Sequence, residues 1–393
     1  MPSPIRILAA RPVVALTFLC SGLGGHLAHG SDAAPAVFST LEELGEALFH
    51  DPNLSANRTQ SCASCHDPEY GFADPRRSAD GAFSLGDDGR SLGDRNAPTA
   101  SYAAFTPPFH QREDGTWVGG MFWDGRAAGL EEQAGGPPLN PIEMGMASKG
   151  QAVLRLKESP EYITAFQAHF GPSVLESADS GYEAMTKAIA AFERSSAFSP
   201  FDSKYDRFLR GEVELSKEEE LGRVLFFSEQ FTNCNQCHQL KRSAIDQEET
   251  FTDYSYHNIG VPENVLGRAE NGVALGTLDE GLLANPAVSD PEARGKFKTP
   301  TLRNVAVTGP YMHNGVFQDL RTVIAFYNRY NSKSEAAQIN PETGEPWGDT
   351  PVPETLSQTE LTHGPALDDR RIDALVAFLK TLTDQRYEAY LEP

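Results

Sequence analysis

The sequence predicts a mainly α-helical protein with two similar domains and long irregular loops. Two short motifs of the form Cys-x-x-Cys-His lie far apart in the chain of 393 residues. An amphipathic helical pattern precedes each motif, whereas the alternating pattern typical of strands is scarce. A chain of this length exceeds the size at which one hydrophobic core stops growing, so two domains are expected.

Both domains are predicted to begin with the same kind of helix. Residues 41–49 (LEELGEALF) and 218–226 (EEELGRVLF) carry Leu-Gly and Leu-Phe at the same spacing. Each pattern starts with the residue pair of a capping box, in which a hydroxyl and a carboxylate satisfy backbone N–H groups at the helix start. These pairs are Thr40 with Glu43 and Ser216 with Glu219. In each half the helix leads into a loop that carries the cysteine motif.

Further helices are predicted at residues 151–170 (interrupted at Ser159-Pro160), 182–195, 320–330 and 368–383. The stretch 241–298 is polar and rich in glycine, and we predict that it forms long loops. The division between the halves is placed near residues 198–200. This gives predicted domains of residues 31–200 and 201–393.

The first 30 residues have the pattern of a signal peptide for export. Arg6 and Arg11 form a basic start, and residues 12–24 form an apolar stretch that is too short to span a bilayer. Ala28 and Gly30 supply small residues at the two positions that a signal peptidase reads, which predicts cleavage before Ser31. We therefore expect a periplasmic protein without a membrane span.

The two cysteine motifs are the most informative feature of the sequence. They are Cys62-Ala63-Ser64-Cys65-His66 and Cys234-Asn235-Gln236-Cys237-His238. This spacing is the attachment signature of c-type haem: the thiols add to the haem as thioethers and the histidine ligates the iron. A structural zinc site is the alternative. The motifs lie 172 residues apart (234 minus 62), and each ends in histidine. Both facts favour two covalently bound haem c groups, each in a cytochrome-c-like domain.

The formal net charge of −22 makes nucleic acid an unsuitable partner. Such a charge favours a docking partner with a basic patch, but it is equally a means of keeping a protein in solution.

Several further motifs, in the same order and at the same spacing, resemble those of the bacterial dihaem cytochrome c peroxidases. They are Phe122-Trp123-Asp124-Gly125-Arg126, Glu132-Gln133-Ala134, Asn140-Pro141-Ile142-Glu143-Met144-Gly145, Thr299-Pro300-Thr301-Leu302-Arg303-Asn304 and Pro310-Tyr311-Met312-His313-Asn314-Gly315. The resemblance runs from about residue 41 to residue 378. It implies that the haem at His66 reacts with hydrogen peroxide and that the haem at His238 relays electrons.

The resemblance also assigns roles around the reactive haem. Trp123 falls where the family places a tryptophan between the haems, as an electron relay; a buried aromatic side chain at a domain interface is the alternative. Glu143 and Gln133 fall on the distal-pocket positions. A desolvated carboxylate suits a proton shuttle between the two peroxide oxygens, and an amide can orient the peroxide. Without the resemblance, Glu143 would be read as a solvated acid.

Two departures from the family pattern refine the prediction. Many members carry a blocking histidine after the first motif, whereas no histidine lies between His66 and His110 here, so the first haem is expected to be open. Many members place a methionine ligand twelve residues after the glycine at 315, where this chain has Tyr327. A phenolate favours ferric and higher oxidation states. Ligation by Met312 is the alternative.

Tyrosine ligation resembles the MauG/MbnH branch of the family. Its members hold two oxidising equivalents over both haems as a bis-Fe(IV) state and modify tryptophan in a partner protein. MauG uses a surface tryptophan two residues before the second motif, where this chain has Thr232. Maturation of methylamine dehydrogenase by that route is therefore a poor match, and another partner is favoured.

The family also holds a calcium ion between the haems. The resemblance places its ligands at Asn96, Thr308 and Pro310, and mixed amide and carbonyl oxygens suit calcium. It also implies that His313 and Arg303 hold haem propionates or tune the reduction potential, with ordinary loop hydrogen bonding as the alternative.

Three functions follow from these observations. The first is a periplasmic oxidase that uses hydrogen peroxide to oxidise an aromatic residue of a protein partner. The second is a cytochrome c peroxidase that receives electrons from a small redox protein. The third is an electron carrier without chemistry of its own, which the open first haem argues against.

Overall fold

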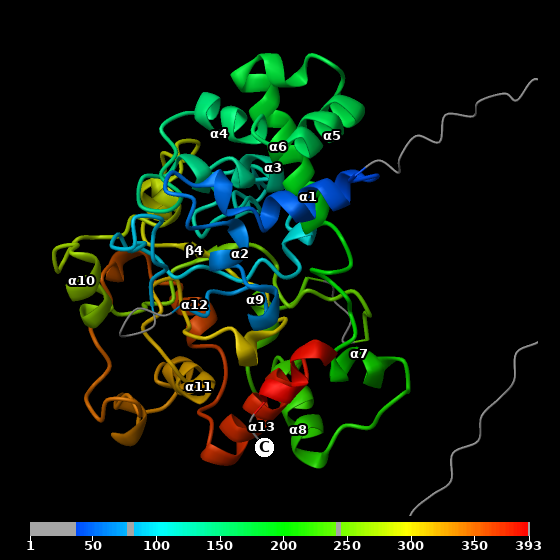
Figure 1. The fold of residues 1–393 in the computed structure, drawn as a ribbon. Coiled ribbons are helices and arrows are strands. Elements are labelled where there is room, and N and C mark those ends of the chain that lie inside the picture. Colours follow the sequence, from blue (N-terminus) through cyan, green and yellow to red (C-terminus); the bar gives the residue numbers. More distant parts are fainter. Residues whose placement is uncertain (1–36, 77–81, 241–244, 392–393) are drawn as a thin grey trace, which may run out of the picture. The chain divides into compact units, whose positions relative to one another are not determined.

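The two predicted helix-and-motif units are both present in a computed structural model of the protein, which describes residues 37–76, 82–240 and 245–391 (Figure 1). In the first unit, helix α1 (Leu41–Phe49) precedes α2 (Cys62–Cys65). In the second, α8 (Lys217–Phe226) precedes α9 (Cys234–Cys237). Both predicted capping boxes form at the starts of α1 and α8. The predicted signal peptide and its cleavage site lie outside the described residues.

Each unit is completed by one long helix that packs against its first helix. α6 (Ala178–Glu193) lies on α1, and α13 (Asp369–Lys380) lies on α8, as Figure 1 shows. Each pair of helices is so close that the glycine of its first helix, Gly45 in α1 or Gly222 in α8, has no room for a side chain. A Cβ atom at Gly45 would lie 1.9 Å from the carbonyl oxygen of Ala188, and one at Gly222 would lie 1.9 Å from that of Ala374. The shared Leu-Gly spacing therefore serves the same close helix crossing twice.

The remaining predicted helices are also present. Residues 151–170 form α4 (Lys149–Leu156) and α5 (Pro160–Phe170), which are interrupted where the sequence predicts. α11 (Leu320–Asn328) lies in the second half. Shorter α-helices are α3 (Leu130–Ala134), α7 (Lys204–Leu209), α10 (Val265–Asn271) and α12 (Gln358–Leu361). Short 3-10 helices connect them at Pro52–Leu54, Pro68–Tyr70, Ala103–Phe105, Pro137–Leu139, Val174–Glu176, Leu282–Ala284, Pro291–Ala293, Val305–Val307, Ala336–Gln338, Pro353–Thr355 and Gln385–Tyr390.

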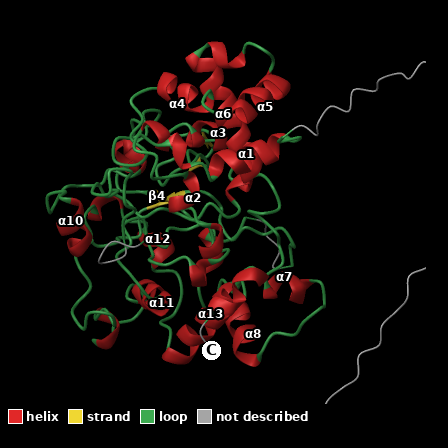
Figure 2. Cartoon of the chain, viewed as in Figure 1, coloured by secondary structure: helices red, strands yellow, loops and turns green. Residues whose placement is uncertain are grey.

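Strands are short, as predicted, and helices and loops dominate Figure 2. β1 (His110–Gln111) pairs antiparallel with β2 (Trp117–Val118), and β3 (Tyr256–His257) with β4 (Phe297–Lys298). Of the stretch 241–298, residues 245–298 are described; they are mostly loop, but they also contain α10, which the sequence analysis did not predict. Two exposed apolar residues open this helix, Val265 and Leu266, so it lacks the amphipathic pattern that would have predicted it.

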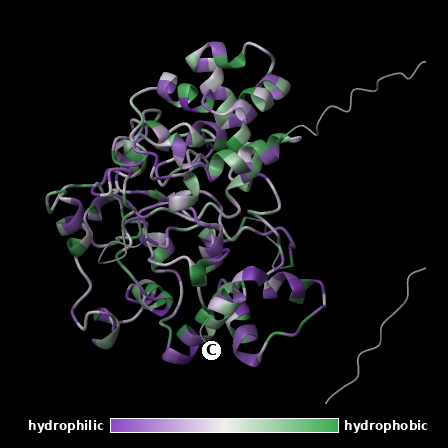
Figure 3. Ribbon diagram, viewed as in Figure 1, coloured by the Kyte–Doolittle hydropathy of each residue, from purple (hydrophilic) through white to green (hydrophobic). Residues whose placement is uncertain are grey.

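Two large hydrophobic cores underlie the two halves. One is built from residues between 44 and 198 around α1 and α6, and the other from residues between 205 and 382 around α8, α11 and α13. Figure 3 shows helices with both hydrophobic and hydrophilic residues, as expected where one face is buried. Residues from Val37 onward form one compact unit by backbone contacts. The predicted boundary at residue 200 stays a prediction, which the position of the two cores supports.

Candidate active site

The histidines of the two motifs are held in the same way. His66 Nδ1 lies 3.2 Å from the carbonyl oxygen of Phe72, and His238 Nδ1 lies 3.2 Å from that of Phe251. Burial lowers the pKa of both imidazoles, which keeps them neutral. A neutral ring that donates from Nδ1 to a carbonyl leaves the Nε2 lone pair for a metal, which is the usual second contact of a metal-bound histidine.

The cysteines precede the histidines within one short helix in each half, α2 and α9. Cys65 Sγ accepts hydrogen bonds from Gln60 Nε2 at 3.2 Å and from Arg76 Nη2 at 3.1 Å. Burial raises the pKa of the Cys65 thiol to about 11, so this sulfur is uncharged. Uncharged, buried sulfurs beside a neutral imidazole suit thioether attachment of haem.

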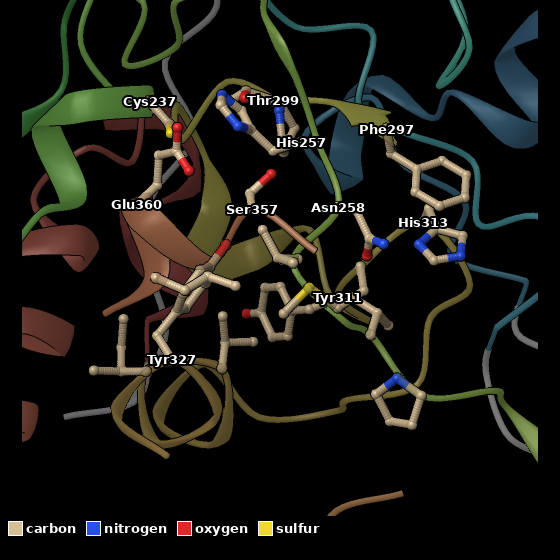
Figure 4. A pocket seen from close by; sticks show the side chains of 18 of the residues that line it. Cys237, His257, Asn258, Phe297, Thr299, Tyr311, His313, Tyr327, Ser357 and Glu360 are labelled. Carbon is tan, nitrogen blue, oxygen red and sulfur yellow. The ribbon is translucent and has the colours of Figure 1, made fainter. Parts of the chain in front are cut away.

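A cavity of about 740 Å³ adjoins the second motif (Figure 4). Its volume lies within the range of about 300–1,000 Å³ that is usual for cofactor and ligand sites. Cys234, Cys237 and His238 line this cavity, and much of its remaining wall is apolar. The apolar wall includes Leu302, Leu320, Val323, Ile324, Leu375 and Leu379. The lining of this cavity fits a haem c, because it combines two cysteines and a histidine for attachment with apolar side chains that enclose the ring.

Tyr327 points from α11 into this cavity (Figure 4). Burial raises the pKa of its hydroxyl, and the nearby sulfurs of Cys237 and Cys234 raise it further. Tyr327 and both cysteines of the second motif therefore face the same cavity. Met312 lines the same cavity, so both residues named as possible iron ligands face it.

Trp123 belongs to the first half but also lines the cavity of the second. Its indole N–H donates to the carbonyl oxygen of Asn96 at 2.8 Å, and its own carbonyl accepts from the N–H of Lys298 at 2.9 Å. The first contact holds the ring, and the second holds the backbone of Trp123 against β4 of the second half. This position suits a relay, and it equally shows that the ring packs at an interface.

The loop of Trp123 has a counterpart in the second half. Met121 forms an antiparallel β-bridge with Ala127 in the first loop, and Tyr311 forms one with Phe317 in the second. Trp123 and His313 occupy equivalent positions, two residues after the first bridging residue of each loop. The His313 ring stacks on Phe297 with centroids 3.6 Å apart and lines the cavity.

Glu143 lies near the first motif. Burial raises the pKa of its carboxyl, although Arg126 and Asn140 act in the opposite direction. The charge of Glu143 in turn contributes to the raised pKa values of Cys62 and Cys65. Gln133 is half-buried on α3, and its backbone N–H donates to Gly129 at 3.0 Å. A buried carboxyl with a raised pKa suits proton transfer near neutral pH.

The three positions of the expected calcium site lie together. Asn96, Thr308 and Pro310 line one small cavity of about 10 Å³, close to the minimum for a single water-sized occupant. The Asn96 side-chain amide donates to the carbonyl oxygen of Pro310 at 2.7 Å. A calcium ion would need the amide oxygen on that side, and the two orientations of an amide differ only by a flip.

Comparisons with known proteins agree with this geometry. Residues 39–214 match the family described as di-haem cytochrome c peroxidase. The methylamine utilization protein MauG of Paracoccus denitrificans is 53% identical over 363 residues, which cover 92% of this chain and 93% of that protein.

Two solved structures are also similar. A variant of the diheme peroxidase BthA from Burkholderia thailandensis has a TM-score of 0.77 and 33% identity, covering 88% of this chain and 86% of BthA. A MauG-like protein associated with microbial copper homeostasis has a TM-score of 0.65 and 32% identity, covering 88% and 89%. The chain belongs to the dihaem cytochrome c peroxidase and MauG family. As a MauG-type dihaem oxidoreductase that acts on peroxide, it carries two c-type haems in a mainly α-helical fold.

Arg303 was expected to hold a haem propionate or to tune the reduction potential, with ordinary hydrogen bonding within the fold as the alternative. Its side chain is fully buried and forms an ion pair with Asp206, which favours that alternative. Nε and Nη2 of Arg303 donate to the carbonyl oxygen of Glu249 at 2.9 and 2.7 Å. These contacts hold the guanidinium inside the second half, where it stabilises the fold. His313, in contrast, does line the cavity.

Two charged residues near the haem sites were not found from the sequence. Glu193 ends α6, and burial raises its pKa to about 8; its charge contributes to the raised pKa of Cys62. Lys298 is half-buried beside Trp123 and donates to the carbonyl oxygen of Gly120, and desolvation of its amine lowers its pKa to about 8. Neither sits in a motif, and only the fold brings them to the sites.

Among the described residues, no helix is long and apolar enough to cross a bilayer.

Proposed function

We propose that the protein is a periplasmic MauG-type oxidase that reduces hydrogen peroxide and uses the oxidising equivalents to oxidise an aromatic residue, a tryptophan, of a partner protein. The observation that carries this proposal is Tyr327 in the cavity of the second haem. An anionic phenolate stabilises higher oxidation states of iron, whereas a methionine thioether stabilises the reduced state. The similarity to MauG along nearly the whole chain supports the same choice.

The haem groups, when bound, supply the redox chemistry, and the residues of the first half prepare the peroxide. Gln133 orients it through its amide. Glu143 accepts a proton from one peroxide oxygen and returns it to the other, which then leaves as water. The raised pKa of Glu143 allows both transfers, because a strongly acidic carboxyl would not take up the proton.

Trp123 links the two halves in this scheme. Its ring reaches the cavity of the second haem, while its backbone belongs to the loop that leads to Gln133. The hydrogen bond of the indole N–H holds the ring, and the one at the backbone carbonyl ties its loop to β4. A fixed ring passes electrons without rearrangement, so oxidising equivalents formed in one half become available in the other.

The partner protein is proposed to differ from the precursor of methylamine dehydrogenase. Thr232 is buried, and its hydroxyl donates to the carbonyl oxygen of Leu225 at 2.6 Å. An exposed tryptophan at this position, which MauG uses to draw electrons from its substrate, is therefore replaced by a small buried side chain.

A calcium ion between the halves is proposed at Asn96, Thr308 and Pro310. Their shared small cavity supports it, since Asn96 and the carbonyl of Pro310 already lie in contact. Calcium-selective chelation is expected to slow the reaction with peroxide. Full activity after chelation, together with no calcium in the purified protein, would contradict the site.

Replacement of Tyr327 tests the proposed function. In the Tyr327→Met variant we expect a changed spectrum and a raised reduction potential of the second haem, with activity shifted towards simple peroxidase turnover. Tyr330→Phe, three residues further along, is the matched control and should leave both unchanged. Met312→Leu tests the other candidate ligand. An unchanged second haem in Tyr327→Met, with a changed one in Met312→Leu, would overturn tyrosine ligation and favour the peroxidase reading.

A further inference from the structure

Three tyrosine rings lie in sequence beside the loop that follows the first cysteine motif and reach the surface. Tyr70 ends the 3-10 helix Pro68–Tyr70, and Tyr387 and Tyr390 lie on the 3-10 helix Gln385–Tyr390. The rings of Tyr387 and Tyr390 have centroids 6.5 Å apart at an interplanar angle of 23°. Those of Tyr390 and Tyr70 are 6.2 Å apart and parallel to within 1°.

The inner end of the stack touches the loop that holds the iron ligand of the first half. The hydroxyl of Tyr387 donates to the carbonyl oxygen of Pro68 at 2.6 Å, and Pro68 lies two residues after His66. The same loop continues to Phe72, whose carbonyl oxygen fixes the His66 ring. Tyr387 is buried, with 2% of its surface exposed, and packs against this loop, which also carries Tyr70.

The outer end of the stack is open to solvent. Tyr70 is 47% exposed and Tyr390 is 55% exposed. Large aromatic side chains are usually more buried than this, and here two of them lie side by side at the surface. Stacking at this separation is worth about 0.5–1.5 kcal/mol, which holds the two rings together although both face solvent.

Proton chemistry distinguishes the inner ring from the outer pair. A phenol that loses an electron becomes a strong acid and must release its proton. The Tyr387 hydroxyl donates to a carbonyl, which is no base, and burial raises its pKa to about 12. Tyr387 can pass an electron but cannot release its proton. Tyr70 and Tyr390 can release theirs to water, so the oxidised state settles on the outer pair.

We propose that Tyr70 and Tyr390 form a surface oxidation site of the first half, where small neutral phenols give up electrons one at a time. The net charge of −22 disfavours anionic donors and places no penalty on neutral ones. Each phenol loses one electron and one proton, and two such losses reduce one hydrogen peroxide to two waters. The inference rests on the peroxide reduction of the proposed function but not on the identity of its protein partner.

Without a donor, the pair is oxidised itself. Each phenol loses one electron and one proton, and a carbon–carbon bond forms between the two rings. These two electrons and two protons convert one hydrogen peroxide to two waters. The overall reaction therefore turns two tyrosines and one hydrogen peroxide into one dityrosine and two waters. The cross-link removes two hydrogens from the mass of the chain, and dityrosine has its own fluorescence.

The test uses the dihaem protein and its Tyr70→Phe/Tyr390→Phe variant. After peroxide is added without a donor, we expect dityrosine fluorescence and a Tyr70–Tyr390 cross-linked peptide in the wild type, and neither in the variant. With a neutral phenol such as guaiacol, the variant should oxidise the phenol several-fold more slowly while its haem spectra stay unchanged. Tyr162→Phe is the matched control, because Tyr162 donates to Asp51 in the same half and lies outside the stack; it should behave as the wild type.

The outcomes separate the two proposals. If peroxide is consumed but the cross-link and the phenol oxidation are the same in the double variant, the surface site is wrong and the proposed function stands. A cross-link that involves other tyrosines would also overturn it. If the wild type consumes no peroxide, the proposed function is wrong, and the surface site falls with it.

Discussion

Replacement of Gly222 by alanine should destabilise the second half, although alanine is the better helix former. Gly222 lies within α8 where that helix crosses α13, and a Cβ atom there would lie 1.9 Å from the carbonyl oxygen of Ala374 and 2.8 Å from the Cβ of Phe378. Neither neighbour is the end of a flexible side chain. The clash can be relieved only if the two helices move apart.

The magnitude follows from two opposing effects. Overpacking costs about 1–3 kcal/mol, and the upper end applies here because backbone must move. The gain in helix propensity from glycine to alanine is about 1 kcal/mol. The net loss is therefore about 2 kcal/mol, which lowers the melting temperature of a domain of this size by about 4–8 °C.

The assay is thermal unfolding of the dihaem protein, followed by the absorbance of each haem and by circular dichroism. Gly150→Ala is the matched control, since Gly150 also lies in a helix but its nearest neighbour would be 3.6 Å from the new Cβ atom. That variant should be as stable as the wild type or slightly more stable. If Gly222→Ala were equally stable, the close helix crossing would not be what requires the glycine, and the same argument would fail for Gly45.

Three further predictions concern buried charged groups. Glu143→Gln should slow peroxide reduction, measured by peroxide consumption, by more than about tenfold with unchanged stability, because general acid–base catalysis contributes at least this much; an unchanged rate would exclude Glu143 as the proton carrier. Burial raises the pKa of Glu193 to about 8 from 4.5, so the folded protein binds a proton that the unfolded chain releases. Its contribution to stability is complete below about pH 4.5 and is lost as the pH rises towards 8, at about 1.4 kcal/mol per pH unit. The free energy of unfolding, measured with denaturant, should differ less between pH 5 and pH 8 in Glu193→Gln than in the wild type. An equal difference in the two proteins would contradict the burial argument. Asp206→Ala should cost about 3–5 kcal/mol in unfolding free energy, because it leaves Arg303 buried without its partner; the double variant with Arg303→Met should recover much of this loss.

Local features of this fold could be predicted from the sequence, whereas long-range contacts could not. The capping box of Thr40 and Glu43 and the haem motifs depend on residues within one or two helical turns. The pairing of Arg303 with Asp206 joins residues 97 positions apart, and no periodicity reports it. A motif match therefore suggested a propionate contact, whereas the fold buries this arginine elsewhere.

In the candidate site, too, residues near a motif could be predicted, whereas residues brought in by long-range packing could not. Tyr327 was found because it falls at a fixed distance from a motif, and the fold places it in the cavity of the second haem. Glu193 and Lys298 were missed, since each reaches a haem site only through the packing of α6 or the pairing of β4. The stack of Tyr70 on Tyr390 joins two distant 3-10 helices, and neither segment carries a sequence signal for the other.

Electron paramagnetic resonance of the ferric protein, before and after one equivalent of hydrogen peroxide without prior reduction, tests the central claim most directly. We expect a high-spin signal from an open first haem and a low-spin signal from a second haem ligated by His238 and Tyr327. Both signals should disappear on addition of peroxide, because the oxidising equivalents are shared between the two halves. Two low-spin signals that persist until one electron is supplied would contradict the account and identify a reductively activated peroxidase instead.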